Sequence, residues 1–162
     1  MGYNTEFEGG VAVVPALNAS EVAYLKAFAR SGRAERLKGP YCVEPVHIWP
    51  AGETPSLPTV AEDVTNVNRP PMGQPNRFCH WVASDDGTLI HFDGGEKFHA
   101  AEDWMTYLID HFLRPGALAQ GHPGFEGFTF DHTVNGTILA QGEGWGDSWS
   151  LVVTDNVVDV QY

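Results

Sequence analysis

Apolar and polar residues alternate at the start of the chain and predict a first strand. The alternation runs over residues 3–14 and continues into β-branched residues after Gly9 and Gly10. A period of two is typical of a strand with one buried face, and glycines inside such a run favour a bulge or bend. Pro15 ends the pattern. We therefore predict a strand over residues 3–14 that bends at Gly9-Gly10.

A helical pattern follows the first strand. Asn18 and Glu21 have the spacing of an N-cap residue and its reciprocal acid, which predicts a helix beginning at about residue 19. Gly32 is the predicted C-cap, so the helix is expected over about 19–31. The residues that form its apolar stripe are Val22, Leu25, Phe28 and Ala29.

Residues 40–77 contain eight of the eleven prolines and no sustained period. We interpret this segment as a long ordered loop or arm, because connections of this length in compact domains tend to be lids, binding loops or arms exchanged between copies. A homo-oligomer formed through the 40–77 arm is one such possibility. The alternative is a surface insertion held down by Tyr41, Ile48 and Trp49.

A hairpin is predicted over residues 78–93. Two apolar runs, 78–83 and 88–93, flank a turn at Asp86-Gly87, which is a strong two-residue hairpin signal. This register pairs Ala83 with Ile90 and places alternate residues on opposite faces. The face expected in the core carries Cys79, Trp81, Ala83, Ile90 and Phe92, and the other carries His80, Val82, His91 and Asp93.

The rest of the chain predicts one more helix and a run of strands. A helix is expected over about 99–113, ended by Pro115-Gly116. Four strands are expected at about 128–134, 137–142, 149–154 and 157–161, with turns at Asn135-Gly136 and Asp155-Asn156.

This order of elements predicts a single α+β domain over residues 1–162. Two amphipathic helices and alternating strands call for helices on one face of an antiparallel or mixed sheet. The first six elements follow the ferredoxin-like, split βαβ order, with extra C-terminal strands and the long Pro-rich arm.

Composition narrows the setting of this domain. No run approaches 18 apolar residues, and the N-terminus has neither a basic region nor an apolar stretch, so neither membrane insertion nor export is expected. Cys42 and Cys79 are too few for a disulfide framework and are interpreted as small buried side chains. We expect a cytoplasmic protein.

The net charge of −12 is unevenly distributed. Residues 71–162 hold thirteen acidic and three basic residues, and no basic residue follows Arg114, so direct binding of nucleic acid is not expected. The opposite charge is concentrated near the first helix. This basic cluster, which is predicted to bind an anionic ligand or else to be a solvated helix face, consists of Lys26, Arg30, Arg33, Arg36 and Lys38.

Two further sets of residues are candidates for ligand binding. His80, His91 and Asp93 share the predicted outer hairpin face and would suit a divalent metal, although such residues also occur on ordinary solvent-facing sheets. Trp145 and Trp149 flank a Gly-rich turn and could wall a small-molecule pocket, to which Trp49 of the arm adds a surface aromatic. No G-x-S-x-G nucleophile motif occurs.

Four stretches of the C-terminal half stand out, namely FCHWVASDDGTLIHFDGGEKF at 78–98, WMTYLIDHFLRP at 104–115, Asn135-Gly136 and Asp155-Asn156-Val157-Val158. With these stretches the chain resembles a family of small uncharacterised phage and bacterial proteins. The resemblance carries no established activity, so it assigns no catalytic residue. It implies a mobile-element accessory protein that binds a host component or a signal molecule, in the host cytoplasm if phage-encoded.

Three functional hypotheses follow. The first is a non-enzymatic binding protein, without a cofactor, that captures a host protein or a small phosphorylated or nucleotide-like anion and acts in counter-defence. The second is an enzyme that uses a divalent metal on the His80, His91 and Asp93 face. The third is an acidic mimic of nucleic acid that blocks a DNA-binding host factor.

Overall fold

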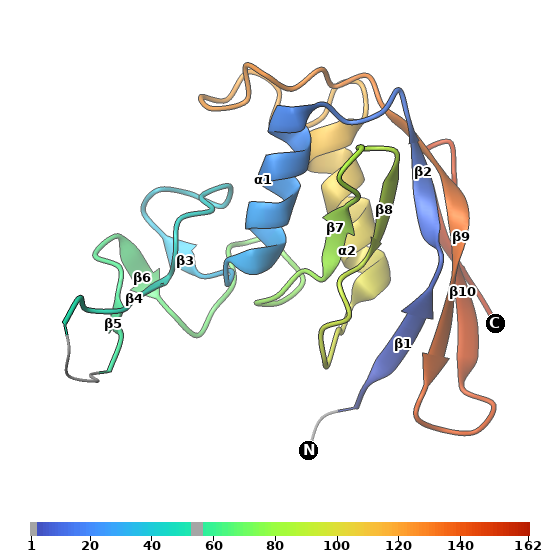
Figure 1. Cartoon of the computed structure of the whole chain (residues 1–162), viewed down its shortest axis with the longest axis horizontal. Coiled ribbons are helices and arrows are strands. Elements are labelled where there is room, and N and C mark those ends of the chain that lie inside the picture. The colour runs from blue at the N-terminus through green and yellow to red at the C-terminus, as the bar shows by residue number, and fades with distance from the viewer. Residues whose placement is uncertain (1–2, 53–56) are drawn as a thin grey trace.

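The computed structural model describes residues 3–52 and 57–162 and has the predicted α+β class (Figure 1). In this part of the chain the main sheet is antiparallel at every pairing, with the order β11-β10-β9-β2-β8-β7 and with β1 also beside β9. Its strands are β1 (Thr5–Glu8), β2 (Gly10–Val14), β7 (Trp81–Ala83), β8 (Leu89–Phe92), β9 (Thr133–Gly142), β10 (Ser148–Thr154) and β11 (Val157–Gln161).

The predicted bend in the first strand is confirmed. β1 and β2 lie end to end along β9, and Gly9 between them has a φ of +94°, which an L residue adopts only at a cost. The two segments pair with opposite halves of β9, as Glu8 faces Leu139 and Val11 faces Gly136. The alternation of polar and apolar residues therefore continues through the bend.

The predicted turn at Asn135-Gly136 is wrong. The two expected strands at 128–134 and 137–142 are one ten-residue strand, β9, which begins at Thr133. Gly136 has a φ of +154° and lies between Val11 of β2 and Val153 of β10. An Asn-Gly pair favours a hairpin locally, but hydrogen bonding to strands on both sides keeps the chain extended here.

Gly136→Ala is expected to destabilise the sheet by about 1 to 3 kcal/mol. A Cβ at this position would lie 2.9 Å from Val11 Cα and 3.0 Å from Gly10 O, so backbone rather than a flexible side chain would have to move. Urea denaturation followed by circular dichroism measures the effect. Gly144→Ala in the β9–β10 turn is the control, because its nearest contact would be 3.5 Å away. Equal stability of the two variants would contradict the prediction.

The hairpin register is confirmed. Trp81 pairs with Phe92, Val82 with His91 and Ala83 with Ile90. The inner face is buried as expected, with Trp81 1% and Ile90 0% exposed. The turn itself differs from the predicted Asp86-Gly87 turn, because Gly87 N donates to Ser84 O at 3.0 Å and Asp85 and Asp86 are therefore its central residues. Ser84 N donates to Leu89 O and closes the loop, which keeps the predicted pairing of the two strands.

Helix α1 (Ala19–Arg30) begins with the predicted capping box. The Asn18 side chain accepts a hydrogen bond from Glu21 N at 2.9 Å, and the Glu21 carboxylate accepts one from Asn18 N at 2.8 Å. The C-cap is Ser31 rather than Gly32, because the Ser31 backbone N–H already closes on Ala27 O and Ser31 itself is extended.

The second helix differs from the expected single helix over 99–113. Helix α2 (Ala101–Leu108) begins after Ala100, which is left-handed with a φ of +56° and so cannot belong to the first turn. A π-helical turn, η1 (Ile109–Leu113), continues it. The apolar residues of this turn, Ile109, Phe112 and Leu113, are all buried.

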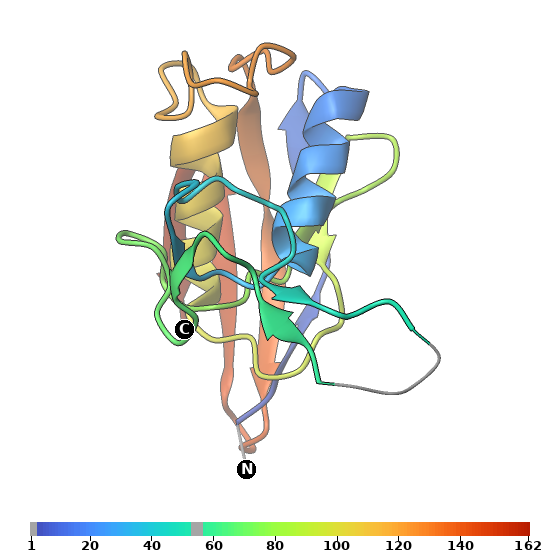
Figure 2. The ribbon, with the colours of Figure 1, turned by 90° about the vertical axis from the view of Figure 1, so that its left-hand side faces the viewer.

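Both helices cover the same face of the sheet, and the core lies between them (Figure 2). Aromatic rings join the two helices, with Phe28 5.7 Å from Trp104 and Tyr24 5.1 Å from Phe112, measured between ring centroids. Such edge-to-face pairs add specificity to the area that they bury. No helix in the described ranges has the length and apolar character needed to cross a bilayer.

The segment from residue 40 to residue 77 (the arm) is more ordered than a loop. Its described residues include β4 (His47–Ile48) paired with β5 (Thr59–Val60), and β6 (Val64–Asn66) paired with β3 (Glu35–Arg36), which precedes the arm. Backbone hydrogen bonds from Glu35 N and Leu37 N also reach into it. The arm thus projects beside the C-terminal end of α1 (Figure 1).

Candidate anion-binding site

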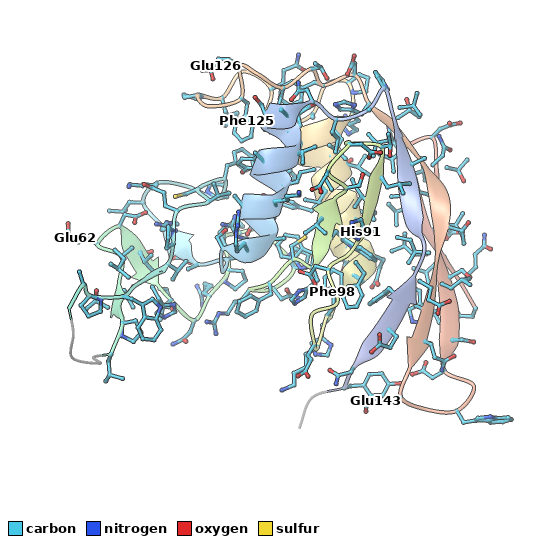
Figure 3. The ribbon with its side chains drawn as sticks, in the orientation of Figure 1. Glu62, His91, Phe98, Phe125, Glu126 and Glu143 are labelled. Carbon is cyan, nitrogen blue, oxygen red and sulfur yellow. The ribbon has the colours of Figure 1, made fainter. Side chains whose placement is uncertain are left out.

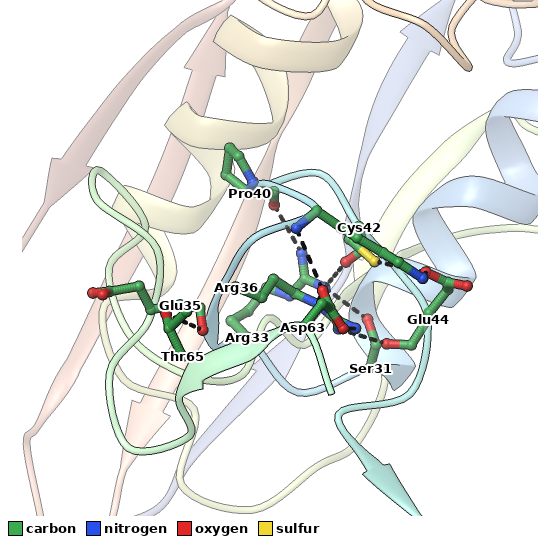
Figure 4. Close-up of polar contacts among 10 residues, drawn as sticks. Ser31, Arg33, Glu35, Arg36, Pro40, Cys42, Glu44, Asp63 and Thr65 are labelled. Atoms are coloured by element: carbon green, nitrogen blue, oxygen red, sulfur yellow. Dashed lines mark hydrogen bonds and ion pairs between the residues drawn. The ribbon is translucent and has the colours of Figure 1, made fainter. Parts of the chain in front are cut away.

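Arg33, predicted as an exposed member of the basic cluster, is buried. Its side chain is 2% exposed and lies over the Phe28 ring, with Cζ 4.1 Å from the ring centroid. The guanidinium donates to Pro40 O, Cys42 O and Ser31 Oγ at 2.6 to 3.2 Å (Figure 4). Arg33 therefore holds the arm against α1, and burial lowers its pKa without a carboxylate partner nearby.

Arg36, another member of the basic cluster, is also committed to an internal contact. It forms two parallel hydrogen bonds of 2.8 Å with the Asp63 carboxylate and a third with Glu44 O (Figure 4). The Arg36 guanidinium lowers the pKa of Asp63 to about 2. Bidentate pairing of this kind fixes geometry, so Arg36 joins β3 to the arm.

Lys26 and Lys38 are paired with surface carboxylates. Lys26 contacts Asp85 of the β7–β8 turn, and Lys38 contacts Glu44 at 2.7 Å. The prediction of one concentrated positive patch is therefore wrong, because four of its five members bind acceptors in the arm or in the β7–β8 turn. Helical spacing placed Arg33 beside Lys26 and Arg30, but the helix ends at Arg30.

A different group of positive side chains surrounds a cavity of about 220 Å³ between the end of α1 and the arm. Arg30 remains from the predicted cluster, and the fold adds Arg77 and His47 beside Arg33. Among the residues that the structure describes, no Asp or Glu lines this cavity. Its lining residues are Arg30, Ser31, Gly32, Arg33, Ala34, Pro45, Val46, His47, Val67, Arg77 and Phe78.

The arginines of this cavity have unused hydrogen-bonding capacity. Across residues 3–52 and 57–162, no carboxylate forms an ion pair with Arg30 or Arg77. Arg33 Nε is buried and has no hydrogen-bond partner in that part of the chain. The Arg33 backbone N–H donates to Arg77 O at 2.8 Å, which fixes the two positions beside each other.

One electrostatic effect opposes an anion at this place. The cavity lies at the C-terminal end of α1, where the helix dipole is equivalent to roughly half a negative charge. Arg30, Arg33 and Arg77 carry three full positive charges, because a guanidinium stays protonated in proteins. The positive charge therefore prevails, and the arginine side chains rather than the helix end must provide the affinity for an anion.

Two of the three predicted metal ligands meet. His80 Nδ1 lies 3.0 Å from both carboxylate oxygens of Asp93, as their opposed positions on the hairpin predict. His91 (Figure 3) instead places Nδ1 2.9 Å from Phe92 O. Within the described residues, no three His, Cys, Asp or Glu side chains are grouped closely enough to hold a metal ion.

The three candidate tryptophans are not part of the arginine-lined cavity. Trp49 is 70% exposed just after β4, and Trp145 is fully exposed in the β9–β10 turn. Trp149 is half-buried, with its ring centroid 5.9 Å from that of Phe7. It also lines an open hollow of about 680 Å³ on β1, β9, β10 and β11. The structure therefore separates these aromatics from the basic side chains.

Three of the acidic residues lie far apart on the molecule (Figure 3). Glu62 lies on the arm, Glu126 in the loop above the helices and Glu143 in the β9–β10 turn, at three extremities of the molecule (Figure 3). A nucleic-acid mimic needs its carboxylates in a regular row, so these positions do not contribute to one common acidic surface.

Cys42 lies in a separate hollow of about 590 Å³ with Tyr24, Tyr41, Glu44 and His122. Burial raises the pKa of the Cys42 thiol, which also donates to Glu44 Oε2 at 3.3 Å. A thiol with a raised pKa holds little thiolate near neutral pH, so Cys42 lacks the activation that a nucleophile requires.

Comparisons with known proteins return no relative that bears on this site: no family model, curated protein or solved structure matches the chain. The site is therefore interpreted from its own chemistry. Sequence reasoning missed Arg77, His47 and Phe78, because they are separated by up to 48 residues from Arg30 and carry no motif. The one available signal was that Arg77 is a basic residue close to the end of the Pro-rich segment.

Proposed function

We propose that this protein is a non-enzymatic binding protein that captures a small anionic ligand in the cavity lined by Arg30, Arg33, Arg77 and His47. The observation that carries the proposal is a set of basic side chains around a concave site that, within residues 3–52 and 57–162, no carboxylate lines. Elsewhere on this acidic protein, most basic side chains of the predicted cluster already have acceptors. Unpaired arginines in a cavity are suited to phosphate or carboxylate groups.

The size of the cavity limits the ligand. Pockets for drug-sized molecules usually hold about 300 to 1,000 Å³, and this one holds about 220 Å³. It therefore suits one phosphate or carboxylate group with a small attached group rather than an enclosed polyphosphate. Capture of a phosphorylated signal molecule is consistent with the proposed setting, a phage-type accessory protein acting in counter-defence.

Arg77→Gln is expected to weaken the binding of inorganic phosphate by about tenfold or more, because a hydrogen bond to a charged group contributes about 1.5 to 3 kcal/mol. Arg30→Gln should act in the same direction. Isothermal titration calorimetry at low ionic strength measures the affinity, which should fall as sodium chloride screens the site.

The matched control is Arg114→Gln, which removes the same charge from the opposite end of the helix layer, where Arg114 pairs with Asp110. With parent and variants compared at about 0.15 M ionic strength, where the Debye length is about 8 Å, it should leave phosphate affinity within about twofold of the parent. If Arg77→Gln and Arg114→Gln bind phosphate equally well, the arginine-lined cavity is not the binding site.

We also infer that the fold is of the ferredoxin-like, split βαβ type with added strands. The four strands β9-β2-β8-β7 are neighbours in this order, and α1 and α2 connect them on one face, which supports this arrangement. β10 and β11 extend the sheet beyond β9. The arm is then an insertion between the first helix and the second strand of the core motif.

A further inference from the structure

The mouth of the arginine-lined cavity has an aromatic wall. Phe78 lines the cavity and keeps 50% of its surface exposed, although it is a large apolar side chain. Its ring lies beside the turn that follows α1, since a Cβ on Gly32 would be 3.6 Å from Phe78 Cε1. One side of the ring therefore packs against the turn that follows α1, while another part of the ring faces solvent.

The charged and apolar sides of the cavity lie next to each other. Arg77 Cζ is 5.7 Å from the Phe78 ring centroid, within the range of a cation–π contact. Val46 and Val67 add apolar surface to the same lining. A bare inorganic anion would use the arginines and leave this apolar surface exposed to water, whereas a ligand with an attached flat ring would cover it.

We propose that the ligand is a phosphomonoester whose organic group carries an aromatic ring. The phosphate binds Arg30 and Arg77, and the ring packs against Phe78. This inference rests on the proposed function, since it assigns the ligand class of the same cavity. A nucleoside monophosphate and an aryl phosphate such as phosphotyrosine share this chemistry.

The first experiment compares inorganic phosphate, cyclohexyl phosphate and phenyl phosphate by calorimetry at one ionic strength. Phenyl phosphate is expected to bind about fivefold or more tightly than inorganic phosphate, since stacking on an aromatic side chain commonly changes affinity by at least that factor. It should also bind more tightly than cyclohexyl phosphate, which has a similar size and no aromatic face. Equal affinity for the cyclohexyl and phenyl esters would overturn the proposal.

Variants of Phe78 assign the preference to this ring. Phe78→Leu should reduce the affinity for phenyl phosphate several-fold and leave inorganic phosphate unchanged, while Phe78→Tyr should retain the preference. Half of the Phe78 surface is already exposed, so both variants should fold. Thermal unfolding measures whether each variant is folded. Loss of both ligands by the same factor in Phe78→Leu would mean that the ring supports the cavity only, and the proposal would fail.

Two further probes separate the possible sources of the ring. Uridine 5′-monophosphate represents nucleotides, and O-phosphotyrosine represents phosphorylated amino acids. The probe that binds more tightly identifies the source of the ring. If neither probe binds more tightly than inorganic phosphate, the inference is contradicted.

Failure of this inference differs from failure of the proposed function. If Arg77→Gln weakens phosphate binding and Phe78→Leu changes nothing, only the aromatic preference is wrong, whereas insensitivity to Arg77→Gln removes the site itself.

Discussion

His132→Ala is expected to lower the free energy of unfolding by about 3 to 5 kcal/mol, because it leaves the Glu21 carboxylate buried without its charged partner. Glu21 is 0% and His132 1% exposed, and His132 Nε2 lies 2.7 Å from Glu21 Oε2. His132 Nδ1 donates to Pro15 O at 2.7 Å. Both ring nitrogens face acceptors, which favours the protonated imidazole and raises its pKa above 6.5. Urea denaturation measures the loss.

The pair joins three distant parts of the chain. Glu21 belongs to the first turn of α1 and also accepts from Asn18 N, while His132 precedes β9 and contacts the end of β2 through Pro15. Glu21→Gln should cost less than His132→Ala, because the amide oxygen can still accept from Asn18 N and His132 can become neutral by losing its proton once its carboxylate partner is gone. Asp131→Asn is the control, because Asp131 is half-exposed and lies 3.8 Å from the imidazole. A loss below about 1 kcal/mol for His132→Ala, as for an exposed pair, would contradict the assignment.

The same pair predicts how stability depends on pH. Burial by itself raises the pKa of Glu21, but hydrogen bonds from His132 and Asn18 reverse this and hold the pKa below its usual value of 4.5. Burial lowers the pKa of His132, but its bonds to Glu21 and Pro15 raise it above 6.5. The carboxylate contribution is lost as the pH falls through the lowered pKa, and the imidazolium contribution as the pH rises through the raised one. The stability difference between the parent and His132→Ala should therefore be largest between about pH 4.5 and 6.5.

Arg33→Met is expected to lower the free energy of unfolding by about 2 to 4 kcal/mol and to loosen the arm, because several hydrogen bonds from a buried guanidinium are lost. Cys42 O loses its guanidinium donor, and Pro40 O keeps only the donor from the Gln74 amide. Arg33→Lys should not restore stability, since an ammonium lacks the planar fork that reaches these acceptors together. Hydrogen exchange of the arm and thermal unfolding report the two effects.

Arg30→Met is the matched control for this prediction. Arg30 is exposed in the last turn of α1, so its removal should change stability by no more than about 0.5 kcal/mol while it weakens anion binding. Arg30→Met therefore tests binding without the loss of stability that is expected of Arg33→Met. Unchanged exchange rates in the arm of Arg33→Met would show that other contacts hold it in place.

Local patterns predicted those parts of the fold that depend on neighbours in the sequence. Asn18 and Glu21 cap a helix through contacts three residues apart, and the short loop between Ser84 and Leu89 keeps Trp81 opposite Phe92, so both features were predictable. The failures have two different causes. At Asn135-Gly136, pairing with β2 and β10 overrides a local turn preference, and at Ala100 a left-handed residue delays the start of the helix.

The sequence by itself determined an α+β domain, its acidic charge and the presence of basic residues near the end of the first helix. The tertiary structure alone decided what each positive charge does. Arg33 and Arg36 follow Arg30 closely in sequence, but their guanidinium groups donate to acceptors in the arm. Arg77, which is 47 residues from Arg30, lines the same cavity as Arg30. A guanidinium can be satisfied by any acceptor that the fold brings within reach, and such acceptors are fixed by long-range packing, which sequence spacing does not contain.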